Sequence, residues 1–337
     1  MIKMMNKKLP STNILLILFG IIGVVAFLIT SDSKEIASLS ETKQNGMNTK
    51  AASTTRVVPT VLPTDQIYKN ARTVYVIPEY KLIFFTFPKV ACSEWKRMFM
   101  RMNDNPLWCK IRGISVHDPE ISNLSILSDY SPEVATAMMT SPAWTRAAIV
   151  REPKERVLSA FLDKAVKETY YNRKCCQKIP DETDRKLCIK NRKEFKSFLH
   201  FVSKYPELCF DVHWEPQAVK IDSKWWPYVD FIGHQSNLLD DSKQILKSIT
   251  SSRDSIPGRN AWDRYGVDGW GNDNELCELR PKSFLEENTS AHNLDTGHHL
   301  LEWYTPETEK MVEETWAVEW QIETVEFPKV VLFPDEK

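Results

Sequence analysis

Several familiar sequence signatures are missing from this chain. The phosphate-loop pattern GxxxxGK[ST] is absent, and glycine is scarce, with 10 residues among 337. Because that pattern cradles the phosphates of nucleoside triphosphates, a nucleoside triphosphate is a poor first candidate for the ligand. The formal net charge is −1, which argues against a general nucleic-acid binder, since such domains usually show a strong basic excess. No internal repeat is evident.

The amino terminus carries one long apolar run. Ile14–Ile29 contains no charged or strongly polar side chain, and Lys3, Lys7 and Lys8 precede it. The run is short for a plasma-membrane span but fits a thinner early-secretory bilayer. The basic flank predicts that the rest of the chain lies in the lumen. We expect an uncleaved anchor at residues 14–30 behind a cytoplasmic tail at 1–13; the alternative is a cleaved signal peptide, for which AFLITSDS is a weak site.

The remainder divides into a stem and one domain. Residues 31–72 contain neither Trp nor Phe and few other large apolar side chains, so they cannot bury enough surface to offset chain ordering. We interpret them as a flexible luminal stem. Residues 73–337 are rich in Trp and long enough for one sizeable α/β domain. This domain contains no D-x-D motif, which disfavours a luminal glycosyltransferase with the same layout.

All seven cysteines lie beyond the apolar run, where an oxidising lumen would permit disulfides. No C-x-x-C pair occurs, so a zinc site is disfavoured. The sequons at Asn123 and Asn288 fit luminal exposure. Four cysteines gather in a charged segment without clear periodicity, which we interpret as an insertion held by bridges of open connectivity: Cys175, Cys176, Cys188 and Cys209.

A first strand-to-helix junction begins with the apolar run KLIFFT at Lys81–Thr86, followed by FPKVACSEWKRMF at Phe87–Phe99. A strand that runs into a short Lys/Ser loop and then an amphipathic helix presents backbone N–H groups and a helix N-terminus to a phosphate. The loop has no glycine, and Lys89 precedes the turn instead of closing it. It is a candidate phosphate cradle of an unusual kind.

A second junction follows the apolar run Ala147–Val150, with Pro153 suited to the first helical position. Arg151 would then lie at the carboxyl end of a strand, where ligands gather in open α/β sheets. Ser159 lies under two helical turns further on and could reach an anion held by Arg151. Taken alone, the pattern fits equally an Arg151–Glu152 surface pair and an ordinary helical serine.

Together the two junctions resemble the two halves of the site for 3′-phosphoadenosine-5′-phosphosulfate (PAPS) in sulfotransferases. The local sequences are most similar to those of the Golgi carbohydrate sulfotransferases of the chondroitin/dermatan 4-O type. Their P-K-x-x-C-[ST]-x-W-K-R loop is matched at residues 88–97, and their V-R-E-P-x-E-R-L-x-S-A motif at 150–160 apart from Val157 and Leu158. Segments beginning at Asp211, Tyr228 and Tyr304 resemble further landmarks in the family's order. The resemblance spans about residues 81–321.

This resemblance implies an α/β, P-loop-like sulfotransferase fold with a central parallel sheet flanked by helices. It also implies transfer of a sulfuryl group from PAPS to a hydroxyl of a glycan or proteoglycan in the Golgi lumen, without a metal. A non-catalytic luminal protein that binds the same ligands is the alternative. The donor-binding residues that it implies are Lys89, Val90, Ala91, Cys92, Ser93, Glu94, Trp95, Lys96, Arg97, Arg151 and Ser159.

The resemblance also suggests which groups act on the reacting atoms. Lys89 is the expected cation near the bridging oxygen, where it would neutralise charge on the departing 3′,5′-diphosphate. A sugar hydroxyl is a weak nucleophile, so a general base should lie within hydrogen-bond reach of it. His117 is the expected base, because relatives carry a histidine in a comparable place between the two motifs and imidazole titrates near working pH. His213 is the rival and Glu94 a more distant candidate.

One departure from the family concerns the acceptor side. The family usually has a Cys pair in the segment that corresponds to Ala218–Pro227, and this chain has none there. We infer a rewired disulfide pattern and a different acceptor surface, so the choice of sugar stays open. Trp225 and Trp226 either pack in the core or stack on a sugar ring.

Other features predict structure only. Ser131 and Thr305 each precede a proline, as at helix starts. The helix predicted after Thr305 places Val312, Trp316 and Trp320 at four-residue intervals, which indicates a stripe facing the core.

Overall fold

The computed structural model describes residues 73–110, 115–166, 169–209, 211–266, 299–322 and 325–334. The chain divides into two compact units, Met1–Val57 and Val58–Lys337, and every described residue belongs to the second. The predicted cytoplasmic tail, anchor and stem lie outside the described residues, as do Cys277 and Asn288. Within the ranges given above, no helix is long and apolar enough to cross a membrane.

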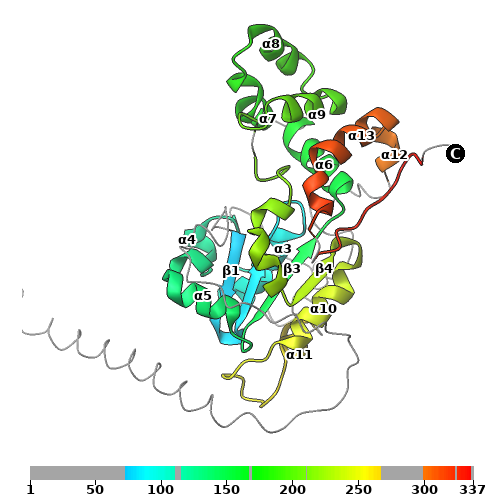
Figure 1. Ribbon diagram of the computed structural model, residues 1–337. Helices are drawn as coiled ribbons and strands as arrows, with labels where there is room; N and C mark the ends of the chain where they lie inside the picture. The colour runs from blue at the N-terminus through cyan, green and yellow to red at the C-terminus, as the bar shows by residue number, and fades with distance from the viewer. Residues whose placement is uncertain are drawn as a thin grey trace, which may run out of the picture. The chain divides into compact units, whose positions relative to one another are not determined.

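Four strands form one sheet in the order β1-β2-β3-β4 (Figure 1): Val74–Ile77, Leu82–Phe85, Thr145–Val150 and Phe231–His234. Strands β2, β3 and β4 are parallel, so their carboxyl ends meet at one edge. Strand β1 pairs antiparallel with β2, because the turn Pro78–Tyr80 between them is far too short for a parallel crossover. The predicted parallel sheet is therefore confirmed for β2 to β4 and corrected at β1.

Helices flank the sheet and connect its strands (Figure 1). Two predicted helix starts are confirmed, since Ser131 Oγ accepts a hydrogen bond from the Val134 amide and Thr305 Oγ1 accepts one from the Thr308 amide. Helix α6 continues into a π-helical turn at Leu162–Val166. The helices of the described part are α3 Cys92–Met102, α4 Pro119–Ser122, α5 Pro132–Thr140, α6 Pro153–Phe161, α7 Tyr170–Lys174, α8 Glu182–Lys190, α9 Phe195–Lys204, α10 Leu238–Ser248, α11 Ala261–Tyr265, α12 Leu300–Trp303 and α13 Pro306–Thr315.

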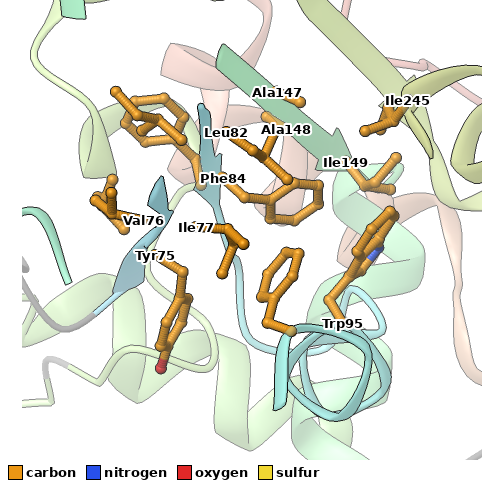
Figure 2. Packing of buried hydrophobic residues seen from close by; sticks show 14 of the residues in the cluster. Tyr75, Val76, Ile77, Leu82, Phe84, Trp95, Ala147, Ala148, Ile149 and Ile245 are labelled. Atoms are coloured by element: carbon orange, nitrogen blue, oxygen red, sulfur yellow. The ribbon is translucent and has the colours of Figure 1, made fainter. Parts of the chain in front are cut away.

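The first hydrophobic cluster surrounds the sheet. Every residue of β1 and β2 is buried, which explains their continuous apolar runs. Trp95 of α3 packs against Phe84 of β2 with ring centroids 4.3 Å apart, and Ile245 of α10 belongs to the same cluster, as Figure 2 shows. Trp225 and Trp226 are also buried in it, so both pack in the core.

A second hydrophobic cluster lies among α6, α9, α12 and α13, which gather together in Figure 1. Val312 and Trp316 are buried in it, as predicted for the stripe of α13, whereas Trp320 packs partly buried against the first cluster. The predicted insertion also packs here, and its four cysteines form two bridges: Cys175–Cys209 and Cys176–Cys188. The prediction of a bridged segment is thus confirmed and its connectivity resolved.

Candidate functional site

The loop between β2 and α3 is held in an unusual backbone conformation. Lys89 and Ala91 have left-handed φ angles of 70° and 50°, which cost a non-glycine residue roughly 1–2 kcal/mol each. Such strain persists only where the surroundings impose it, and it gathers at functional sites. Ala91 caps α3 without a side-chain hydrogen bond, so the first amides of this 11-residue helix point into the space before it, as at anion sites.

Two arginines from the second junction hold this β2–α3 loop. Arg151 Nη1 donates to the carbonyl oxygen of Lys89 at 3.1 Å, and Arg156 Nε donates to the carbonyl oxygen of Pro88 at 3.1 Å. Arg156 lies in α6 and is fully buried. Because β2 and β3 are parallel neighbours, the helices that follow them begin at the same edge of the sheet. The structure therefore brings the two predicted junctions together.

The side chain of Lys89 is buried against a carboxylate from α6's π-helical turn. Lys89 Nζ lies 3.2 Å from Asp163 Oδ2, and Lys164 Nζ lies 3.2 Å from the same oxygen. Burial lowers the pKa of Lys89, and Asp163 only partly offsets this. Burial would raise the pKa of Asp163, but the two ammonium groups outweigh it and the pKa lies below its ordinary value. Asp163 is thus an ionised partner that holds Lys89 at the loop.

His117 reaches the start of α3 from a distant part of the sequence. Its Nε2 lies 3.0 Å from Ser93 Oγ, and its Nδ1 lies 2.8 Å from Lys96 Nζ. An ammonium group can only donate, so Nδ1 accepts, and the neutral ring carries its proton on Nε2 and donates it to Ser93. Burial lowers the pKa of Lys96. Three of the predicted site residues, Ser93, Lys96 and His117, therefore form one contact group.

The other predicted donor-binding residues are placed less directly. Val90 and Trp95 are buried in the first cluster, while Cys92 begins α3. Ser159 is buried on α6, and the described contacts of the Arg151 guanidinium are with Lys89 and Glu155.

Arg97 and Glu94 lie on α3 beside the contact group. Arg97 Nη1 donates to the carbonyl oxygens of Trp108 and Lys110 at 3.0 and 2.8 Å, so it stabilises the chain after α3. Burial raises the pKa of Glu94, whose Oε2 has no hydrogen-bond partner among the described residues. Roles of Arg97 and Glu94 in donor binding stay predictions.

A second polar group lies beyond the π-helical turn. His213 Nδ1 and Asp211 Oδ1 are 2.5 Å apart, and the Tyr170 hydroxyl donates to Asp211 Oδ2 at 2.6 Å. Burial opposes ionisation of Asp211, but the hydrogen bonds from His213 and Tyr170 lower its pKa below the ordinary value. Of these three residues, sequence reasoning singled out only His213. The D-x-H spacing, with an acid two residues before a histidine in a turn, is the signal that could have found Asp211.

Sequence reasoning also missed Arg156 and Gln217. The Gln217 side chain accepts from the Arg151 amide at 3.0 Å and donates to the Arg151 carbonyl at 2.9 Å, which fixes the backbone at the end of β3. Both residues lie in segments that resemble the family, Arg156 in the motif at 150–160 and Gln217 in the segment that begins at Asp211, but the motifs alone did not indicate what these side chains contact. Among the described residues, no group of His, Cys, Asp or Glu could hold a metal ion.

The model of the Sulfotransferase family matches residues 72–265, more than half of the chain. Carbohydrate sulfotransferase 9 of Homo sapiens is 27% identical over 216 residues, which cover 60% of this chain and 46% of that protein. Carbohydrate sulfotransferase 10 of Homo sapiens is 27% identical over 218 residues, covering 58% and 59%. Carbohydrate sulfotransferase 11 of Rattus norvegicus is 26% identical over 181 residues, covering 50% of each.

The chain spans about half the length of the curated relatives it matches. No solved structure matches it at a significant level. The matched family region contains the β2–α3 loop, His117, Arg151 and the turn from Asp211 to His213. The chain therefore belongs to the sulfotransferase family.

Proposed function

We propose that this protein transfers a sulfuryl group from PAPS to a hydroxyl of a glycan, as a carbohydrate O-sulfotransferase. The observation that carries the proposal is the hydrogen bond of 3.1 Å from Arg151 to the Lys89 carbonyl. This contact joins the loop that carries Lys89, and the helix amides that follow it, to a guanidinium at the end of the neighbouring parallel strand. The names of the relatives, all carbohydrate sulfotransferases, support a glycan as the acceptor.

The residues present fit a donor with two separate anionic groups. Lys89, Lys96 and Ser93 would hold the 5′-phosphosulfate together with the first amides of α3. Arg151 would hold the 3′-phosphate through its planar fork. Lys96 is buried and the Lys89 side chain is mostly buried, and burial lowers the pKa of each. A bound anion favours the charged form of both side chains, and perturbed groups of this kind gather at functional sites.

The chemistry asks for positioning more than for covalent work. By analogy with phosphoryl transfer, the protein must align the acceptor oxygen, the sulfur and the leaving oxygen, and stabilise developing charge. Lys89 would neutralise the charge that builds on the departing 3′,5′-diphosphate. Asp163 contacts the Lys89 ammonium and so restricts the side-chain conformations of Lys89 near the proposed leaving group.

The proposal extends to location: a single-pass membrane protein of the Golgi with its catalytic domain in the lumen. The apolar run Ile14–Ile29 with its basic flank supports an anchor. The two disulfides support an oxidising compartment. Asn123 is exposed at the end of α4, where a glycan could be attached.

The test is to incubate the full-length protein in detergent with radiolabelled PAPS and a panel of glycans, including chondroitin, dermatan and desulfated heparan. We expect label on at least one glycan. Binding of adenosine 3′,5′-diphosphate without transfer to any glycan would select the non-catalytic alternative. Absence of both binding and transfer would contradict the proposed function altogether.

A further inference from the structure

We propose that His213 is the general base of the reaction and that Asp211 and Tyr170 position it. This inference rests on the proposed function and replaces His117, the base expected from the sequence, with a residue held by a carboxylate. The arrangement of a histidine oriented by a third group is the usual logic of an activated nucleophile.

The hydrogen bonds of His213 leave the required lone pair on its outer nitrogen. Asp211 is ionised and accepts hydrogen bonds, so the 2.5 Å contact with His213 Nδ1 assigns the ring proton to Nδ1. The lone pair then lies on Nε2, for which the described residues provide no hydrogen-bond partner. The His213 side chain is 22% exposed, so solvent or a substrate hydroxyl can approach it.

One buried guanidinium places His213 next to the donor loop. Arg156 donates to the carbonyl oxygen of Pro88 at 3.1 Å and to that of Val212 at 3.2 Å. Both carbonyl oxygens therefore lie within a few ångströms of each other. Lys89 directly follows Pro88 in the chain, and His213 directly follows Val212. The backbones of His213, the proposed base, and Lys89, the proposed leaving-group cation, are thus both held next to the Arg156 guanidinium.

A second chain of contacts joins the same two residues. Asp163 contacts the ammonium groups of both Lys89 and Lys164. Lys164 Nζ in turn lies 5.5 Å from the centre of the Tyr170 ring, and the ring of Tyr170 meets that of His213 edge-on with centroids 5.6 Å apart. The two groups are therefore positioned by a continuous path through the π-helical turn and α7.

The contacts of His117 suit a different role. Its Nδ1 accepts from Lys96, and its Nε2 donates to Ser93, so both nitrogens are engaged with groups proposed to hold the donor. A ring in this state has no lone pair available for a sugar hydroxyl. His117 is therefore a positioning residue for Ser93 and Lys96.

In the proposed reaction, sulfuryl transfer and proton transfer from the acceptor hydroxyl accompany each other. The acceptor hydroxyl oxygen forms a bond to the sulfur of PAPS, while its proton passes to His213 Nε2. The bond between sulfur and the 5′-phosphate oxygen breaks, and its electron pair leaves with adenosine 3′,5′-diphosphate next to Lys89. His213 then holds a positive charge beside the Asp211 carboxylate until it releases the proton to solvent.

The first experiment replaces His213 with asparagine in the full-length protein, with the best glycan of the panel as acceptor. Asparagine can keep a donor for Asp211 but provides no base. We expect kcat to fall about 10²–10⁴-fold, the usual worth of general-base catalysis, with affinity for adenosine 3′,5′-diphosphate changed less than about twofold. His200→Ala, at an exposed histidine of α9, is the control and should keep full activity.

Two further variants keep the inference testable if His213→Asn fails to fold. His213→Ala should regain part of its activity when imidazole is added, which a purely structural role would not allow. Asp211→Asn keeps the ring and should lower kcat at least about tenfold, as loss of a histidine-orienting partner does, with the acceptor KM unchanged. Near-normal kcat in these variants would overturn the assignment.

His117→Ala separates the two histidines. We expect weaker binding of adenosine 3′,5′-diphosphate and, at saturating PAPS, kcat within about tenfold of the wild type. A folded His117→Ala protein that binds the diphosphate normally but transfers nothing would restore His117 as the base. If the wild-type protein itself sulfates no glycan, the proposed function fails; if it does and His213 is dispensable, only this inference fails.

Discussion

Single residues at the edge of the sheet carry contacts from several directions. The backbone amide of Arg151 donates a hydrogen bond to the Gln217 side chain. Its guanidinium donates to the Lys89 carbonyl oxygen and lies 3.2 Å from the Glu155 carboxylate. It is buried, so a bound phosphate would meet a guanidinium already oriented by the protein. Preorganisation of this kind raises affinity because less side-chain freedom is lost on binding.

The first prediction concerns this residue. Arg151→Ala should weaken binding of adenosine 3′,5′-diphosphate tenfold or more, because a hydrogen bond to a charged group contributes about 1.5–3 kcal/mol. Calorimetric titration of the diphosphate measures this. Lys89→Ala should depress kcat more than donor affinity, because its proposed partner gains charge in the transition state. Unchanged affinity for the diphosphate in a folded Arg151→Ala protein would show that Arg151 does not bind the 3′-phosphate.

The neighbouring residue, Glu152, makes stability depend on pH. Burial raises the pKa of Glu152 to about 7, against hydrogen bonds from the Glu155 and Val330 amides. Between its ordinary range near 4.5 and about 7, the folded protein binds more protons at this site than the unfolded chain. Stability should therefore fall as pH rises through that window, and the full shift corresponds to roughly 3 kcal/mol.

Glu152→Gln keeps an acceptor oxygen and removes the titration. The second prediction is that this variant gains stability relative to the wild type on going from pH 5 to pH 7.5. Urea unfolding of both proteins at the two pH values measures the difference. Parallel behaviour of the two proteins would show that Glu152 does not titrate in this range.

At the scale of elements, α6 is joined to α13 by buried charges. Lys154 is fully buried and lies 2.8 Å from Glu309 and 3.0 Å from Glu313. The Lys196–Glu307 pair joins α9 to the same helix, but both side chains are about 60% exposed. Burial decides the worth of these pairs, since an exposed pair is screened by water and a buried charge without its partner is costly.

The third prediction compares these two pairs. Lys154→Met should reduce the free energy of unfolding by about 3–5 kcal/mol, because it leaves Glu309 buried without its ammonium partner. Lys196→Met should leave the urea midpoint nearly unchanged. Equal losses in both variants would mean that burial does not set the strength of these pairs.

The elements that could be predicted are those with local signals. KLIFFT and the run Ala147–Val150 each predict a buried strand before a helix, and the structure has β2 in the first and β3 over the second. The antiparallel direction of β1 follows from the short turn Pro78–Tyr80, which the sequence analysis did not use. The pairing of four clustered cysteines depends instead on which segments meet in the fold, and no pattern within the cysteine cluster specifies that choice.

The same limit applies to the candidate site. Lys89, Ser93 and Arg151 lie in motifs and were predictable. His117 was proposed from its place between them, yet its contact with Ser93 spans 24 residues. Arg156 lies in the same motif as Arg151, but the motif does not specify its partners, and only the fold brings it to the carbonyl oxygens of Pro88, Val212 and Glu215.

At the scale of the whole molecule, the last described segment, residues 325–334, contacts both hydrophobic clusters. Val325 and Phe327 are buried in the first, and Leu332 and Phe333 pack against the second. Glu309 accepts hydrogen bonds from the amides of Leu332 and Phe333 at 2.8 and 3.0 Å. The segment therefore acts as a strap across the two halves of the domain.

This strap has a consequence for the order of events during synthesis. Glu309 and Lys154 are made before residues 330–333, so on a nascent chain both side chains must await the backbone groups that they bind in the finished fold. The two clusters cannot complete their packing while the strap is still inside the ribosome. The packing of both clusters is therefore completed only after residues 325–333 have emerged from the ribosome.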